Sequence, residues 1–158
     1  MINDNASNVI IRRATLADAT YVATHLRNAD KLELIRCGWA DFETPLRQSV
    51  EMSPFAGVAL KDDVPICVFG LLPDSLIGDR ARVWLLGTPL ISRVKKTFIK
   101  YAHRFIEEML GRYPILYNAV DAQNEPAKRL LQALGATFYQ TVDMHGSPFL
   151  LFEIRRNK

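Results

Sequence analysis

The chain has 158 residues, 49% of them hydrophobic and 23% charged, with a formal net charge of +3. This composition predicts a single domain over residues 9–156, preceded by a flexible segment, 1–8. No uncharged apolar run reaches the ~18 residues that cross a membrane, and residues 1–5 lack the basic and apolar regions of a signal peptide. We therefore expect neither a membrane span nor a secretory leader, and we expect a cytoplasmic protein.

The cysteines and the distribution of charge indicate which kinds of site the chain can contain. Cys37 and Cys67 are far apart, with no CxxC spacing and no companion histidines. We expect two reduced, buried thiols, with neither a disulfide framework nor a metal site. Basic residues concentrate at 93–96, 128–129 and 155–158. This distribution suits a phosphate-bearing cofactor, nucleic acid or an acidic protein, and equally a solvated face without a partner.

Hydrophobic periodicity divides the chain into helices and strands. Thr15 with Asp18 forms a capping-box pattern before the first helix, and Thr44 is expected to cap another. Ser92 is expected to open the longest helix and Gly111 to end it. The expected strands are 9–13, 55–60, 64–72, 81–86, 115–120, 137–142 and 149–154, and the expected helices are 16–30, 45–52, 92–110 and 125–134, with one or two helical turns over 32–39.

The order of these elements predicts the fold class. It runs strand, two helices, three strands, helix, strand, helix and two strands. The three consecutive strands between 55 and 86 favour antiparallel pairing, whereas the helix between strands 81–86 and 115–120 favours a parallel crossover. We therefore expect an α/β (α+β) fold with a mixed sheet.

This element order resembles the GNAT N-acetyltransferase superfamily, and segment 124–136 carries the resemblance in sequence. It is similar to the family's Asn-x-x-Ala-x-x-Leu-Tyr-x-x-x-Gly-Phe motif, and Asn124 and Gly135 match. Leu131 stands where the family has a tyrosine proposed to protonate the leaving thiolate, and Ala136 replaces an aromatic residue. The resemblance implies a GNAT-like fold with acetyl-CoA as the candidate cofactor, and a missing proton donor.

The turn after the fourth expected strand departs from the family pattern. Active members carry Arg/Gln-x-x-Gly-x-Gly/Ala there, whose backbone N–H groups hold pyrophosphate at a helix N-terminus. Here Leu90 and Ile91 are expected to crowd that approach. The basic residues that follow either supply compensating charge or are simply solvated. The resemblance places the candidate cofactor-binding residues at Leu86, Thr88, Arg93, Lys95, Lys96 and Asn124.

Few residues are candidates for catalysis. Asp121 and Glu43 are candidate bases. Tyr139 is a candidate replacement for the missing tyrosine, with ordinary strand packing as the alternative. Asn118 and Asn124 can hydrogen-bond a ligand, although a helix cap is the simpler explanation of Asn124. The histidines are expected at the surface or in packing contacts: His25, His103 and His145.

A narrower resemblance covers residues 83–154, which look like the GNAT-like internal virion proteins of short-tailed phages. Segments 108–113 and 134–138 and the closing strand 149–154 carry it. It implies a phage-encoded protein of the virion or its assembly with a degenerate acetyl-CoA site. The expected location is the host cytoplasm and the virion, and the expected partners are phage virion or host proteins.

Three alternatives stay open at this point. The chain can be an active acyl-CoA-dependent N-acetyltransferase acting on a protein or a small amine, with acetyl-CoA bound. It can instead be a modulator of a host protein. Nucleic-acid binding rests only on basic charge interleaved with tyrosines.

Overall fold

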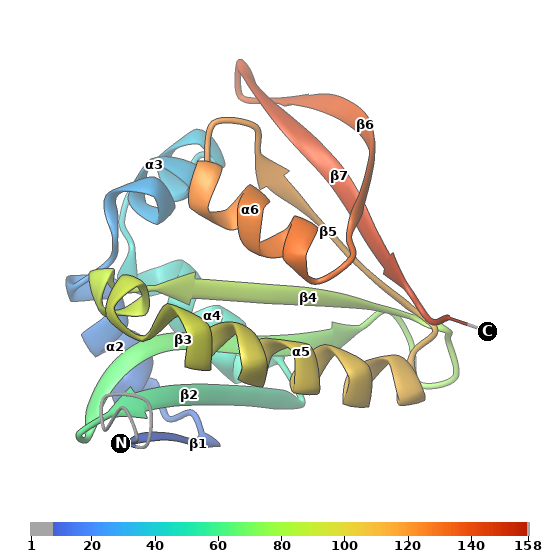
Figure 1. Cartoon of the computed structure of the whole chain (residues 1–158). Coiled ribbons are helices and arrows are strands. Elements are labelled where there is room, and N and C mark those ends of the chain that lie inside the picture. Colours follow the sequence, from blue (N-terminus) through green and yellow to red (C-terminus); the bar gives the residue numbers. More distant parts are fainter. Residues whose placement is uncertain (1–7, 158) are drawn as a thin grey trace.

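A seven-stranded mixed sheet runs through the computed structural model, which describes residues 8–157 (Figure 1). Its strand order is β1-β2-β3-β4-β5-β7-β6, and β4 with β5 is the parallel pair. The predicted mixed sheet is confirmed. The expected N-terminal segment 1–8 lies, apart from Asn8, outside the described residues. The strands are β1 Val9–Arg13, β2 Phe55–Lys61, β3 Val64–Pro73, β4 Arg80–Gly87, β5 Ile115–Asp121, β6 Thr137–Met144 and β7 Ser147–Arg155.

Helices cover both faces of this sheet. In Figure 1, α5 and α6 lie in front of it, α2 and α4 lie behind it, and α3 stands beside the far end of β5. The side chains of β3 alternate accordingly: Val68 packs with the α2 and α4 residues, whereas Cys67 and Phe69 pack with α5. The helices are α2 Leu16–Thr24, α3 Asn28–Arg36, α4 Glu43–Met52, the 3₁₀ helix η1 Pro89–Val94, α5 Lys95–Arg112 and α6 Glu125–Ala133.

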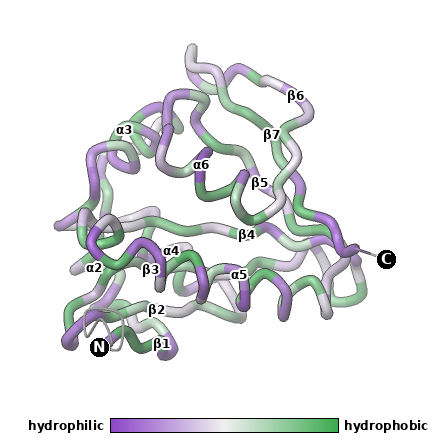
Figure 2. Tube along the Cα trace, in the orientation of Figure 1, coloured by the Kyte–Doolittle hydropathy of each residue, from purple (hydrophilic) through white to green (hydrophobic). Residues whose placement is uncertain are grey.

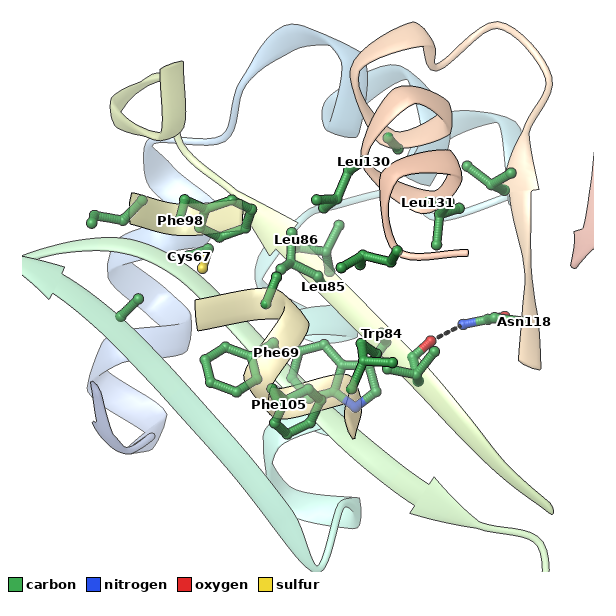
Figure 3. Close-up of a pocket in the computed structure, with 18 of the residues that line it drawn as sticks. Cys67, Phe69, Trp84, Leu85, Leu86, Phe98, Phe105, Asn118, Leu130 and Leu131 are labelled. Atoms are coloured by element: carbon green, nitrogen blue, oxygen red, sulfur yellow. Dashed lines mark hydrogen bonds between the residues drawn. The ribbon is translucent and has the colours of Figure 1, made fainter. Parts of the chain in front are cut away.

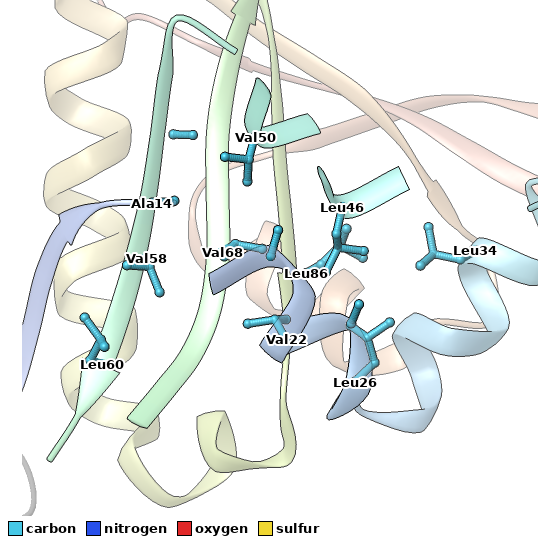
Figure 4. Packing of buried hydrophobic residues seen from close by; sticks show 13 residues of the cluster. Ala14, Val22, Leu26, Leu34, Leu46, Val50, Val58, Leu60, Val68 and Leu86 are labelled. Atoms are coloured by element: carbon cyan, nitrogen blue, oxygen red, sulfur yellow. The ribbon is translucent and has the colours of Figure 1, made fainter. Parts of the chain in front are cut away.

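The core under α2 and α4 is closely filled (Figure 4). Val22 of α2, Leu46 of α4 and Val58 of β2 have no exposed surface. The predicted capping box of α2 is confirmed, because Thr15 Oγ1 accepts the Asp18 N–H and the Asp18 carboxylate accepts the Thr15 N–H. This side of the sheet is a packed hydrophobic layer.

The expected helix over 16–30 was wrong in its extent. The chain leaves the helix after Thr24 and begins α3 at Asn28. Between them Arg27 is extended, and its backbone N–H donates to Gly87 O of β4 at 2.9 Å. A tertiary hydrogen bond thus breaks a helical pattern that periodicity favoured. Three helices therefore precede β2, where two and a short turn were expected.

Four other expected boundaries also need correction. Thr44 lies inside α4, where its N–H is held by Asp41 Oδ2, and does not cap the helix. Ser92 does not open the long helix, because Thr88 caps η1 and α5 begins at Lys95. Helix α5 continues through Gly111 to Arg112. The β6–β7 connection is shorter than expected, a two-residue turn in which His145 and Gly146 have positive φ.

The hydropathy of the chain follows this layering. In Figure 2, the trace of α5 alternates between hydrophobic and hydrophilic segments, as expected of a helix with one face on a sheet. Cys67 is buried, as predicted, and Cys37 is partly buried; both are free thiols. Among residues 8–157, no helix is long and apolar enough to cross a membrane.

Candidate functional site

The parallel strands β4 and β5 separate soon after they begin. The residues Arg80–Arg82 pair with Ile115–Tyr117, and no further pairing joins the two strands within the described chain. The side chain of Asn118 spans the point of separation, because its Nδ2 donates to Val83 O at 2.9 Å. The sheet therefore contains a V-shaped opening whose narrow end is closed by an amide side chain.

An apolar cleft of about 270 Å³ occupies this opening and the space between α5 and α6 (Figure 3). It extends through the opening to Glu33 and Leu34 of α3 on the other side, and to Cys37, which follows that helix. Its remaining lining comes mainly from the two helices and the strands beneath them. Residues that Figure 3 labels in this lining are Cys67, Phe69, Trp84, Leu85, Leu86, Phe98, Phe105, Asn118, Leu130 and Leu131.

Helix α6 is held at its ends more than along its length. Asn124 caps it by accepting the Ala127 N–H, and Gly135, with φ +88°, ends it as predicted. None of its nine residues is fully buried. Its apolar side, which includes Leu130 and Leu131, faces the cleft. Leu130 and Leu131 are only partly buried against the sheet, and the space left beside them forms part of the cleft.

The wide end of the opening is closed by two acidic residues of α3. Asp30 Oδ2 accepts the N–H of Gly87, the last residue of β4, at 2.8 Å. Glu33 Oε1 accepts the N–H of Asp121, the last residue of β5, at 2.9 Å. The Nδ2 of Asn124 donates to both carboxylates, at 3.1 Å each. Three side chains thus tie together the ends of β4, β5 and the start of α6.

The charges in this network are unevenly compensated. Asp30 pairs with Arg27 at 2.9 Å, and the fully buried Asp121 pairs with Arg36 at 2.6 Å. Glu33 has no cation within 4.0 Å among the described residues. Burial, with the neighbouring Asp30 and Asp121 charges adding to it, raises the pKa of Glu33 to about 7. Glu33 therefore changes protonation near neutral pH on the wall of the cleft.

The backbone N–H groups of the β4–η1 turn are engaged within the protein. Gly87 donates to Asp30, and Thr88 donates to Ile66 O at 2.8 Å. The N–H of Leu90 is held by Thr88 Oγ1, and that of Ile91 by Thr88 O. The turn therefore presents no free cradle of amides of the kind that binds a phosphate.

Ile91 fills the space over this turn. It is buried, and a Cβ built on Gly87 would lie 2.2 Å from Ile91 Cδ1. The side chain packs inward with Val94 and Phe98. The turn therefore offers a phosphate group neither free amides nor open space at Gly87, and in this respect the residues present do not fit the phosphate end of acetyl-CoA.

The sequence-predicted site residues are scattered around this cleft. Leu86 lines it, whereas Thr88 and Asn124 are buried and capping. Asp121 is ion-paired, and Tyr139 is 51% exposed on β6 outside the lining. Their catalytic and binding roles stay predictions. Three basic residues are exposed on η1 and α5 with no carboxylate within 4.0 Å in residues 8–157: Arg93, Lys95 and Lys96.

Other early candidates lie away from the cleft. Glu43 is half-exposed and faces Arg47 and Thr20. The three histidines are exposed, as expected, and His25 stacks on Tyr21 with ring centroids 4.0 Å apart. Within the described part of the chain, no three His, Cys, Asp or Glu side chains gather to hold a metal ion.

Sequence reasoning missed Asp30, Glu33 and Arg36. A signal for them exists, since a spacing of three residues places all three on one side of a helix. That signal was hidden because α3 was expected as part of a longer helix followed by loose turns. Their partners, Gly87, Asp121 and Asn124, are distant in sequence, and only the folded chain brings them together.

Solved structures of GNAT acetyltransferases share this architecture. The chain is similar to a GNAT-family acetyltransferase from Bacillus anthracis, with a TM-score of 0.70, 10% identity and coverage of 94% of this chain and 95% of that one. For a ribosomal-protein-alanine N-acetyltransferase from Brucella melitensis, the TM-score is 0.69 at 16% identity, and the match covers 93% of this chain and 99% of that one. For a spermidine N-acetyltransferase from Vibrio cholerae in complex with CoA and spermine, the TM-score is 0.65 at 14% identity, and the match covers 94% of this chain and 96% of that one. The predicted GNAT fold is confirmed.

A family model also matches part of the sequence. Residues 70–142 match the family described as "Bacteriophage T7, probable scaffold protein Gp13". This stretch covers β4 to β6 and the cleft-lining helices α5 and α6. The predicted likeness to phage proteins is thereby confirmed. No curated protein sequence matches the chain.

Proposed function

We propose that the chain is a phage-encoded protein of the virion or its assembly, which uses the GNAT fold for protein contacts and has a degenerate acetyl-CoA site. The match of residues 70–142 to a phage scaffold family supports the assignment to a phage particle. The fold alone does not establish acetyl transfer, because one fold supports many functions.

One observation supports the proposal that the acetyl-CoA site is degenerate. The amides of the β4–η1 turn donate to Asp30, Ile66 and Thr88, and Ile91 covers Gly87. Freeing these amides would break a buried network that includes the Asp30–Arg27 ion pair. Breaking such a network costs about 3–5 kcal/mol, which a phosphate contact at a helix N-terminus repays only in part.

Calorimetric titration tests the proposal that the acetyl-CoA site is degenerate. Acetyl-CoA and free CoA are titrated into the protein at low and moderate salt, with thermal melts alongside. The spermidine N-acetyltransferase from Vibrio cholerae, solved with CoA, is the positive control. We expect no saturable heat and no rise in melting temperature. Micromolar binding with a raised melting temperature would overturn the degenerate site.

The protein composition of phage particles tests the proposed role in the virion or its assembly. Particles of the phage that encodes the chain are purified on density gradients, and the chain is quantified by mass spectrometry in intact particles and in assembly intermediates. We expect a fixed stoichiometry in at least one of the two. Absence of the chain from both would contradict a role in the virion or its assembly.

A second candidate function is an acyl-CoA-dependent N-acetyltransferase, favoured by the cleft in the V-shaped opening with Glu33 on its wall. In this candidate, the exposed Lys95 and Lys96 hold the anionic cofactor in place of the turn. Lys95→Glu with Lys96→Glu then weakens acetyl-CoA binding without changing the melting temperature. Arg13→Glu with Arg112→Glu makes the same charge change at two exposed residues that have no carboxylate within 4.0 Å in the described chain, and serves as the control. Equal acetyl-CoA affinity in both variants would rule out Lys95 and Lys96 as the cofactor's anchor.

A further inference from the structure

Helix α3 is attached to the domain by little apolar surface. It has nine residues, as α2 has, but it buries one apolar side chain, Leu34, whereas α2 buries three. Leu34 packs with residues of α2 and α4 (Figure 4), while Leu32 and Ile35 of α3 are 44% and 54% exposed. The hydrophobic effect therefore holds α3 in place less strongly than it holds α2.

Polar contacts make up most of the attachment. Asp30 and Glu33 accept the N–H groups at the ends of β4 and β5, and Asn124 donates to both carboxylates. Arg36 pairs with Asp121 at 2.6 Å. When α3 leaves the sheet, water can replace each of these hydrogen bonds, so each contributes only a small net free energy. Helix α3 can thus open locally at a lower cost than an element with a larger apolar core.

The chain on either side of α3 is suited to hinge motion. Residues 25–27 before it are not helical, and Arg27 is extended. After it, Gly38 has φ +92°, and residues 39–42 form neither helix nor strand. The ring of His145 in the β6–β7 turn lies beside Gly38 and is exposed, so this contact adds little buried surface.

Helix α3 also covers one mouth of the apolar cleft. Glu33, Leu34 and Cys37 form the part of the lining that lies beyond the opening between β4 and β5. Detachment of α3 would uncover the cleft on this side. It would also free the N–H groups of Gly87 and Asp121, which α3 now holds.

The charge around Glu33 makes this closure sensitive to pH. The charged groups that face Glu33 come from α3, from the residue before it and from β5: Asp30, Arg36, Arg27 and Asp121. The Cys37 thiol also faces Glu33, and burial raises its pKa to about 11, so it stays neutral. The pKa of Glu33 is about 7 when α3 covers it, and returns towards 4.5 in water. Opening therefore releases a proton and becomes more favourable as the pH rises from 4.5 to 7.

We propose that α3 is a lid on the cleft, which detaches as a unit about residues 25–27 and 38–42 while the sheet and the other helices stay folded. Ionisation of Glu33 raises the population of the open lid. This inference does not depend on the proposed function, because it concerns how the cleft opens and not where the protein assembles.

Hydrogen exchange in the full chain tests the lid. Opening constants, corrected for intrinsic exchange rates, are measured by mass spectrometry for α3 and for α2 at pH 5, 6, 7 and 8. We expect opening constants at least about tenfold larger in α3 than in α2 at each pH. Equal opening constants in the two helices would overturn the lid, because α3 would then open only when the whole domain unfolds.

Two variants test the role of Glu33 separately. In the wild type, the opening constant of α3 should rise at least about tenfold between pH 5 and pH 7, and level off above pH 7. Glu33→Gln keeps an oxygen for the Asp121 N–H and should lose this rise. Glu43→Gln makes the same change at an exposed residue of α4 and should keep it. The same rise in all three proteins would overturn the role of Glu33 in the lid.

Discussion

The two faces of the sheet differ in how completely their helices are packed. Behind the sheet, α2 and α4 bury Val22 and Leu46 completely, and no residue of either helix lines the cleft (Figure 4). In front of it, α6 has no fully buried residue, and its apolar side borders a cleft of about 270 Å³ (Figure 3). Both faces contain a buried core, but only the front face also leaves apolar surface on a helix that packing does not use.

The front face also contains the V-shaped opening between β4 and β5. The opening between β4 and β5 persists, while its wide end is closed by Asp30, Glu33 and Asn124. The fold therefore contains an apolar cleft whose wide end is filled by the protein's own side chains. We expect mutations on the two faces, and in the network between them, to have separable effects.

The largest expected effect is on the packed face. Leu46→Ala should lower the free energy of unfolding by about 3 kcal/mol, because it removes a fully buried side chain and leaves a cavity. Leu131→Ala, at the edge of the cleft, should cost less than about 1.5 kcal/mol, since part of its surface is already unpacked. Urea denaturation of both variants measures the difference. Equal losses would show that the two faces are packed alike.

The second largest expected loss of stability is in the hydrogen-bond network of Asp30, Glu33 and Asn124 at the wide end of the opening. Asp30→Asn weakens its bonds to Gly87, Asn124 and Arg27, and should cost about 2–3 kcal/mol. Glu43→Gln is the control, because the Glu43–Arg47 pair is 3.9 Å long and exposed, and its loss should stay within about 0.5 kcal/mol. The same denaturation assay applies. A cost for Asp30→Asn as small as the control's would mean that the buried network contributes little stability.

A pH effect should follow from Glu33. Its folded pKa of about 7 lies above its ordinary value of 4.5, so the folded state binds the proton more tightly than the unfolded state does. The resulting stabilisation is complete below pH 4.5 and is lost as the pH rises from 4.5 to 7, by at most about 1.4 kcal/mol per pH unit.

Glu33→Gln keeps an oxygen for the N–H groups of Asp121 and Asn124 and cannot titrate. The difference in the free energy of unfolding between Glu33→Gln and wild type should therefore change between pH 5 and pH 7.5, with the variant relatively more stable at the higher pH. A constant difference across this range would show that folding does not raise the pKa of Glu33.

The smallest effect should come from filling the cleft. Ala127→Leu adds apolar atoms on the α6 side of the cleft, and should change the free energy of unfolding by no more than about 1 kcal/mol in either direction. Ala19→Leu adds the same atoms at a fully buried site on α2 and should destabilise the domain by about 1–3 kcal/mol. Thermal melts compare the two, and equal destabilisation would mean that the cleft is closed in solution.

Much of the fold could be predicted because its signals are local. The period-two strands, the capping box at Thr15 and Asp18, and the Asn124 and Gly135 boundaries of α6 each depend on residues a few positions apart. The boundaries that failed depend on distant partners. Arg27 leaves the helical conformation where its N–H donates to Gly87 O, and Thr88 begins η1 where its N–H and hydroxyl donate to Ile66 O.

The features of the candidate site also separate into those that the sequence determines and those that depend on the tertiary structure. By itself, the sequence determined the order of the elements from β2 onward, the absence of glycines at Leu90 and Ile91, and leucine in place of tyrosine at 131, because these depend on residue types at fixed spacing. Tertiary structure alone decided that Asp30 and Glu33 occupy the amides at the ends of β4 and β5, and that β4 and β5 part to form a cleft. The physical reason is that a buried polar group must find a partner, and the folded chain supplied partners far away in sequence.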